Sequence, residues 1–269
     1  RSLYTTMPSG ATQVRVPFDT TLPLSGLGDP ATTADDLTLA SIALYPGSGA
    51  TTVTGLKDAI IQNVRGCQMG TGVTNACVTR PWLLGDIFHS NPLVIGEPRS
   101  FVPEASYFAF ASAHATRDKM IYAGANDGFL HAFLGGTWDA TPPVGEQPAY
   151  DRGTGAETFG FMPWPVRRNI RNLPKDGGSR DFYYVDGSPV AADVWIHGSA
   201  TQTAKAADGS EWRTVVAGGL RQGGRAYYAI DVTDPSSTQV SFDFGSLTTA
   251  DISRIEVLRG SQSALYGSG

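Results

Sequence analysis

Several features that mark common classes of protein are scarce in this sequence of 269 residues. It holds only two cysteines and four histidines, and it lacks the CxxC, HExxH and GxSxG patterns of zinc sites and serine hydrolases. The net charge of -5 comes without any block of Lys or Arg, which argues against a nucleic-acid or anionic-membrane surface. No apolar run approaches the roughly 18 residues of a membrane-spanning helix. The sequence therefore predicts no metal site, no nucleic-acid partner and no membrane-spanning segment.

Glycine and proline, by contrast, are abundant, with 32 and 17 residues, and aromatic residues make up 10% of the chain. This composition favours many short strands joined by turns. One short helix is predicted over 56–64, where apolar residues recur at helical spacing after Thr54 as the N-cap. We divide the chain into a loop-rich lead-in over 1–80, which contains this helix and otherwise loops or edge strands, a strand region over 81–245, and an atypical tail over 246–269.

The two cysteines, Cys67 and Cys77, enclose nine residues of loop composition. A disulfide across so short a loop would stabilise the fold by roughly 2 to 3 kcal/mol, and such bonds persist outside the cytosol. We predict this disulfide, with two unpaired thiols as the alternative. The chain opens at Arg1 with neither an initiator Met nor the apolar core of a signal peptide, so we expect it to be an internal piece of a longer protein.

The strongest local signal is the stretch 120–133, MIYAGANDGFLHAF, in which two apolar runs meet at Asn126, Asp127 and Gly128. Asp and Gly tolerate the positive φ angles that tight hairpin turns require, so this stretch predicts a β-hairpin with those three residues as its turn. His131 falls within the second predicted strand, and we interpret it as a hydrogen-bonded core histidine.

The second half of the strand region resembles the first half in sequence. The segments NPLV (91–94) and SPVA (188–191) lie 97 residues apart, the Ala-Gly pair at 123–124 recurs after 94 residues, and the next strand returns to an offset of 97. The loop at 219–224 is therefore three residues longer than its first copy. An offset that changes only at a loop indicates a true internal repeat.

Each copy supplies four candidate strands, and four antiparallel strands form one blade of a β-propeller. The predicted fold is therefore all-β, a partial β-propeller with two recognisable blades. Because propellers typically need four to eight blades, we expect either completion by sequence beyond this chain or an open assembly of sheets. The predicted strands are 93–97, 120–124, 129–133 and 158–162 in the first copy, and 190–196, 214–218, 226–232 and 240–244 in the second.

Four ordered motifs then resemble a known family. They are WLLGDIFHSNP from Trp82, YAGANDGFLHAF, YYVDGSPVAADVW and WRTVVAGGLRQGGRAYYAIDVTDP. In order and spacing they are similar to the β-propeller domain of the PilY/PilC type IV pilus tip and biogenesis proteins, over about residues 56–235. The resemblance implies a non-enzymatic factor at the pilus tip of a Gram-negative bacterium, in the periplasm or at the cell surface. It also implies pilins and minor pilins as partners, a role in pilus assembly, and adhesion to host or abiotic surfaces.

Two departures limit the resemblance. Members of the family often hold calcium in a DxDxDG-like loop, which is absent here, so we predict no cofactor and interpret Asp231 and Asp234 as a strand end and turn. The tail, DISRIEVLRGSQSALYGSG (251–269), is similar instead to the plug of TonB-dependent receptors. Three explanations of this match are open: a chimeric reading frame, a chance match in a genuine propeller strand, and a natural fusion.

Few residues suggest chemistry. Arg167, Arg168 and Arg171 form the only basic cluster, which is either a solvated loop or a patch for a protein or an anionic glycan. His89 is expected to hold a turn together. A quinone-dependent propeller dehydrogenase is the enzyme alternative, since such enzymes share the hairpin pattern, although the recurrent Trp motifs are missing.

Overall fold

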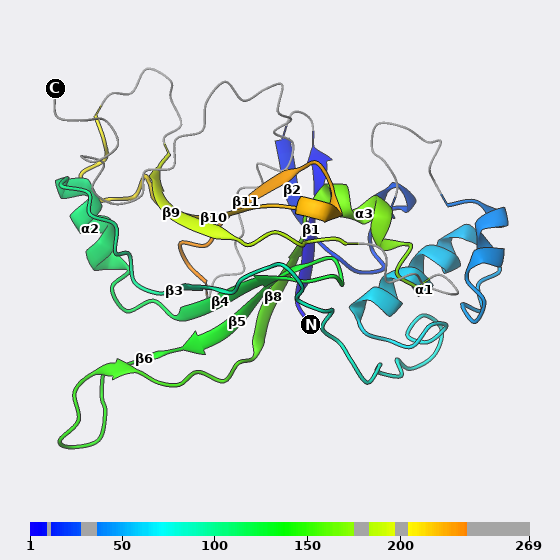
Figure 1. Ribbon diagram of the computed structural model, residues 1–269, viewed down its shortest axis with the longest axis horizontal. Helices are drawn as coiled ribbons and strands as arrows, with labels where there is room; N and C mark the ends of the chain where they lie inside the picture. The colour runs from blue at the N-terminus through cyan, green and yellow to red at the C-terminus, as the bar shows by residue number, and fades with distance from the viewer. Residues whose placement is uncertain (10–11, 28–36, 175–182, 197–203, 236–269) are drawn as a thin grey trace.

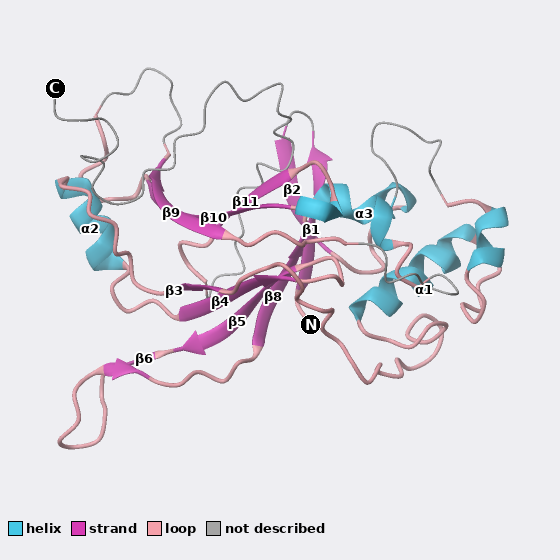
Figure 2. Cartoon of the chain, in the orientation of Figure 1, coloured by secondary structure: helices cyan, strands magenta, loops and turns pink. Residues whose placement is uncertain are grey.

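The computed structural model describes residues 1–9, 12–27, 37–174, 183–196 and 204–235 (Figure 1). The two larger sheets occupy the middle of the molecule, with α2 (Ala105–Ala113) toward one end and α1 (Val53–Arg65) toward the other (Figure 2). None of the helices in the described ranges is both long enough and apolar enough to cross a membrane.

The first predicted blade is present as four neighbouring antiparallel strands. They are β3 (Leu93–Ile95), β4 (Lys119–Gly124), β5 (Leu130–Gly136) and β8 (Glu157–Met162), and they are hydrogen-bonded in that order. The predicted ranges agree with these strands to within three residues at each end. The register is irregular near Met120 and near Phe133, where β-bulges interrupt the ladders.

The second predicted blade is represented by β9 (Val190–Trp195), β10 (Trp212–Gly219) and β11 (Tyr227–Asp231), again antiparallel. β9 begins 97 residues after β3 and β11 begins 97 residues after β5, so the repeat and its offset of 97 are confirmed for these strands. The predicted offset of 94 for the middle strand is wrong by one residue, because Gly124 lies opposite Leu130 and Gly219 lies opposite Tyr227, which gives an offset of 95 and a second loop that is two residues longer, not three. The longer loop of the second copy contains a short 3-10 helix, η3 (Arg221–Gly223). The fourth predicted strand, 240–244, lies outside the described residues.

The larger of the two hydrophobic clusters in the described residues joins the two sheets. Tyr122 of β4, Phe161 of β8 and Tyr228 of β11 are all buried in it, and the rings of the last two lie 6.2 Å apart. Each sheet thus has a face packed against its neighbour. The fold is a partial β-propeller, as predicted.

The N-terminal strands extend the first sheet in a way that the sequence did not indicate. β1 (Leu3–Ser9) lies parallel to β8, with Leu3 opposite Gly160, and β2 (Thr12–Pro17) pairs with β1 as the outer strand. The sheet therefore has six strands, and β1 lies inside it instead of forming an edge. The division of the chain near residues 80 and 245 stays a prediction.

Helix α1 (Val53–Arg65) contains the predicted range 56–64, but its N-cap is Thr52, not Thr54. The Thr52 Oγ1 accepts the Gly55 N–H at 3.0 Å, and the helix ends at Gly66 with φ 118°. Two helices were not predicted, namely α2 (Ala105–Ala113) and α3 (Trp164–Ile170). The remaining elements are the 3-10 helices η1 (Leu24–Leu27) and η2 (Leu39–Leu44), and the two-stranded ribbon of β6 (Trp138–Asp139) and β7 (Ala149–Tyr150).

Candidate functional site

The turn between β4 and β5 is the predicted hairpin turn. The Ala125 N–H donates to the Phe129 carbonyl at 3.0 Å, and the Gly128 N–H donates to the Ala125 carbonyl at 3.3 Å. Gly128 has φ +102°, in the region that disfavours side chains, and a Cβ there would lie 2.5 Å from Ile170 Cδ1. Glycine is thus required both by the backbone and by the helix packed beneath the turn.

Asn126 uses its whole functional group to connect this turn to two other motifs. Its Nδ2 donates to Asp86 Oδ2 at 2.8 Å, its backbone N–H donates to the Asp86 carbonyl at 3.0 Å, and its Oδ1 accepts the Tyr184 N–H at 3.2 Å. Asp127 accepts the Gly85 N–H on Oδ2 at 3.1 Å. The turn residues therefore bind the WLLGDIFHSNP motif on one side and the YYVDGSP motif on the other.

A cluster of four charged side chains, which we call the charge quartet, lies beside the turn. His131 Nδ1 is 2.7 Å from Glu157 Oε1, and His131 Nε2 is 2.9 Å from Asp127 Oδ1. The Arg1 guanidinium donates to both oxygens of Glu157, at 2.7 and 2.9 Å, and lies 3.7 Å from Asp127. With His131 protonated, two positive charges face two carboxylates.

The pKa values follow from this arrangement. Burial opposes the charge on His131, but the nearby Asp127 carboxylate and the hydrogen bonds from both carboxylates outweigh it and raise the His131 pKa to about 9. Burial likewise opposes the charge on Glu157, but hydrogen bonds from His131 and Arg1 lower the Glu157 pKa to about 2. His131 is thus a buried, hydrogen-bonded histidine, as predicted, and it serves to hold carboxylates in place.

A second set of contacts joins equivalent positions of the two repeats. His89 Nδ1 is 2.8 Å from Asp186 Oδ2, and the Asn91 N–H donates to Ser188 Oγ at 3.0 Å. Both pairs are separated by the repeat offset of 97 residues. The His89 ring also packs at 4.3 Å from the Phe88 ring and 5.8 Å from the Tyr183 ring. His89 therefore connects the two repeats, whereas the sequence predicted that it would stabilise a single turn.

The fourth motif reaches the same junction through a close backbone contact. A Cβ at Gly223 would lie 1.7 Å from the Tyr184 carbonyl oxygen, so only glycine fits there. All four motifs thus meet between the sheets, joined by the contacts of Asp86, Asn126 and Tyr184 and by the His89–Asp186 pair. Asp231 ends β11 and accepts the Thr233 N–H at 2.8 Å, as expected of a strand end and turn.

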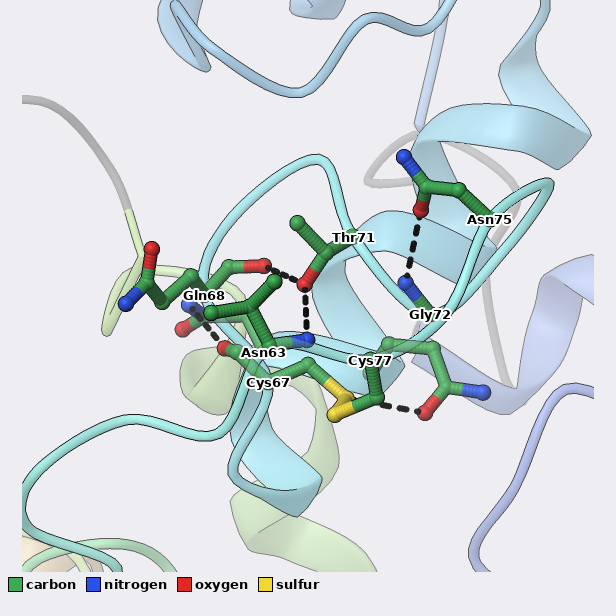
Figure 3. Close-up of a disulfide and its surroundings, with 9 residues drawn as sticks. Asn63, Cys67, Gln68, Thr71, Gly72, Asn75 and Cys77 are labelled. Carbon is green, nitrogen blue, oxygen red and sulfur yellow. Dashed lines mark hydrogen bonds between the residues drawn. A yellow bond between two sulfur atoms is a disulfide. The ribbon is translucent and has the colours of Figure 1, made fainter.

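The cysteines close the loop that follows α1 (Figure 3). The sulfur atoms of Cys67 and Cys77 are 2.04 Å apart and form a disulfide. The Asn63 Nδ2 donates to the Cys67 carbonyl at 3.0 Å, and within the loop the Gly72 N–H donates to Asn75 Oδ1 at 3.1 Å. The disulfide fixes an otherwise exposed loop to the end of the helix.

The basic cluster is not arranged as the sequence suggested. Arg167 and Arg168 lie on α3 instead of a solvated loop, and Arg171 follows directly. The Arg167 side chain is fully buried and donates to Met7 Sδ and to the Trp164 carbonyl. The prediction of a surface patch made by all three arginines is therefore wrong, because only Arg168 among them is exposed and Arg171 is half-buried.

Within the described ranges, no group of three or more His, Cys, Asp or Glu residues could hold a metal ion. His114 ends α2 and packs 4.9 Å from the Phe110 ring, and His197 lies outside the described residues. That the chain has no cofactor stays a prediction.

A sequence model of the PilY1 beta-propeller domain matches residues 84–257. The chain belongs to this PilY1 propeller family. It is 35% identical over 176 residues to the type IV pilus biogenesis factor PilY1 of Pseudomonas aeruginosa strain PAO1, covering 62% of this chain and 13% of that protein. It is 32% identical over 230 residues to a PilY1 homolog of Xylella fastidiosa, covering 82% of this chain and 16% of that protein.

Among solved structures, the chain is similar to the crystal structure of the Pseudomonas aeruginosa PilY1 C-terminal domain, with 30% identity, a TM-score of 0.36, and coverage of 56% of this chain and 25% of that one. The chain spans less than a fifth of the length of the PilY1 proteins described above. The plug-like tail, 251–269, lies outside the described residues. The comparisons give no support to its resemblance to TonB-dependent receptors, and the propeller match runs into it as far as residue 257.

Sequence reasoning found the turn and His131 but missed the charge quartet. Asp127 lies in the hairpin turn and His131 lies four residues later, in the strand that follows. Strand periodicity predicts no contact between side chains at that spacing. Their partners Arg1 and Glu157 are distant in sequence. The one usable signal is that a carboxylate or histidine inside an apolar strand needs a partner.

Proposed function

We propose that this chain is a non-enzymatic part of a type IV pilus biogenesis factor that acts at the pilus tip, where it contacts pilins and minor pilins and supports assembly and attachment. Membership of the PilY1 propeller family is the observation that carries the proposal. In support of a scaffold role, the polar side chains that the motifs bring to the junction between the sheets are bound to one another, as in an internal framework.

The disulfide supports a location in the periplasm or at the cell surface, because disulfides persist in oxidising compartments. The pilin contact would use exposed apolar side chains, and the first motif offers a group of them. Trp82 is 82% exposed and Phe88 is 62% exposed, on one segment with Leu83, Leu84 and Ile87, which are also exposed. Grouped apolar side chains on a surface are characteristic of protein contact sites.

The test combines genetics and binding. Deletion of this region from the parent gene is expected to abolish surface pili and twitching motility. In vitro, purified pilins and minor pilins are expected to bind the immobilised chain. Trp82→Ser with Phe88→Ser should weaken that binding, while Val144→Ser, at a fully exposed position on the β6–β7 loop, should not.

Two results would contradict the proposal. The first is normal piliation in a deletion strain whose truncated protein is still exported at the normal level. The second is reduction of a dye by the purified chain when a quinone cofactor, calcium and an alcohol substrate are supplied, since this would favour the dehydrogenase alternative.

A further inference from the structure

A groove of about 710 Å³ opens between the two sheets, along strands β3 and β9. The strands run in the same direction, because Asn91 contacts Ser188 before both strands begin, and Ser100 Oγ lies 3.1 Å from Asp193 Oδ2 farther along. Leu93, Val94 and Ala191 supply apolar lining. Arg99, Arg117 and Lys119 supply positive charges, and Glu97 and Asp193 supply negative ones, with Arg99 paired to Glu97.

The open edge of β3 presents backbone polar groups. Among the residues that the structure describes, β3 pairs with β4 alone in the sheet order. Backbone groups in an antiparallel strand point alternately to its two sides. Gly124 of β4 donates its N–H to Ser90 Oγ at 2.9 Å, on the β3 side, so Met120 and Tyr122 also turn toward β3. Their partners on β3 are Ile95 and Leu93, which leaves the Val94 N–H and carbonyl pointing away from the sheet.

The same reasoning applies to β9, which pairs with β10 alone among the described strands. The Thr214 carbonyl accepts the Val232 N–H at 2.8 Å and its N–H donates to Thr233 Oγ1 at 2.9 Å, so Thr214 turns toward β11. Asp193, its partner on β9, therefore turns its backbone groups away from β10, and Ala191 does the same. Strand edges on both sides of the groove thus offer hydrogen bonds to an extended chain.

The charges in the groove favour a negative group. Asp193 accepts hydrogen bonds from Tyr107 at 2.7 Å and from Thr214 at 2.6 Å. In the described part of the chain, neither Arg117 nor Lys119 forms an ion pair with a carboxylate. Arg117 donates instead to the Gly96 carbonyl and Thr214 Oγ1, and the Lys119 ammonium lies 3.9 Å from the centre of the Tyr150 ring.

We propose that this groove binds an extended peptide segment of a partner protein, which adds a strand to the free edge of β3. An aliphatic side chain of the peptide packs against the lining near Val94 and Ala191, and an acidic side chain of the peptide lies near Arg117 and Lys119. Main-chain hydrogen bonds give such a complex its affinity, and the flanking side chains give its specificity. The groove proposal does not depend on the pilus role, so its test and the test of the proposed function can fail independently of each other.

The test measures fluorescence polarisation of short labelled peptides in which Thr alternates with Val, Ile and Glu, added to the purified 269-residue chain. Saturable binding is expected. Val94→Pro removes the outward N–H without breaking the β3–β4 ladder and should weaken binding by about tenfold, whereas Val94→Thr, which keeps the backbone, should leave it within about twofold. Lys119→Glu should reverse the preference for a Glu peptide over its Lys counterpart.

Two peptides, one N-methylated at the odd-numbered residues and one at the even-numbered residues, test the hydrogen bonds without any change to the protein, so a folding defect in a variant cannot confuse the result. The one whose methyl groups face β3 should bind at least about tenfold more weakly than its parent. Binding of both methylated peptides as tightly as their parent would overturn the proposal. So would the absence of saturable binding by every peptide of the panel at millimolar concentration.

Discussion

Replacement of His131 by glutamine tests whether the charge quartet stabilises the fold as a charged unit. Glutamine can form hydrogen bonds with Asp127 and Glu157 but cannot carry the positive charge that faces the two carboxylates. Because His131 is completely buried between them, at 2.7 and 2.9 Å, the variant removes the positive charge that lies directly between those carboxylates. We expect His131→Gln to lower the free energy of unfolding, and to do so in a pH-dependent way.

The magnitude comes from the His131 pKa, which is about 9 in the folded protein against 6.5 for an unperturbed histidine. A pKa raised by folding means that the folded state binds the proton more tightly. The protonated ring therefore contributes about 3 kcal/mol of stability, which is fully present below about pH 6.5 and is lost as the pH rises through about 9. The variant lacks this contribution at every pH.

The assay is urea unfolding of both proteins at a series of pH values, without reductant so that the disulfide stays intact. The difference in unfolding free energy should be about 3 kcal/mol near neutral pH and should shrink above about pH 9. Subtracting the unfolding free energies of the two proteins at each pH removes the contribution of groups that titrate identically in both. An NMR titration of the His131 ring gives its pKa directly. A difference that stays constant across this range, or a ring that titrates near 6.5, would refute the reasoning.

Three further changes have defined outcomes. Cys67→Ser with Cys77→Ser should lower the free energy of unfolding by about 3 kcal/mol, because the open loop gains entropy in the unfolded state. Gly128→Ala should cost about 1 to 3 kcal/mol, since alanine is strained at φ +102° and meets the helix beneath the turn. Arg167→Ala should cost about 1 to 3 kcal/mol through lost packing and unpaired buried groups.

Each change has a control, and thermal or urea unfolding measures all of them. Mass analysis under non-reducing conditions should find no alkylatable thiol in the native protein, and two free thiols would contradict the disulfide. Gly145→Ala is matched to Gly128→Ala, because Gly145 has φ +99° but nothing within 4 Å of its added Cβ. If both substitutions lower the free energy of unfolding equally, the contact between residue 128 and the helix contributes nothing to that loss. Arg168→Ala, at an exposed position, should change stability little, and an equal loss would contradict the burial of Arg167.

The repeat was the most informative part of the sequence, because it placed strands by agreement between two copies. Where the chain has no second copy, the sequence indicated helix α1 and the disulfide but not the strand pairing. The pairing of β1 with β8 leaves no local trace, since strand partners are chosen by tertiary contact. The apolar segment 105–113 has no polar face to indicate a helix, and α2 forms because Tyr107 and Phe110 pack with Trp212. The basic cluster misled because charge alone cannot distinguish a solvated arginine from a buried one.

The parallel pairing of β1 with β8 has a consequence for the order of events in folding. The Thr5 hydroxyl and the Met162 carbonyl that it binds at 2.9 Å are 157 residues apart in the chain. A ribosome or an export channel delivers residues in sequence, so the hairpin of β1 and β2 must wait with an open edge until β8 emerges. Contacts of such long range form slowly, and unpaired edges aggregate. The edge of β1 that pairs with β8 therefore stays exposed until residue 162 has been delivered.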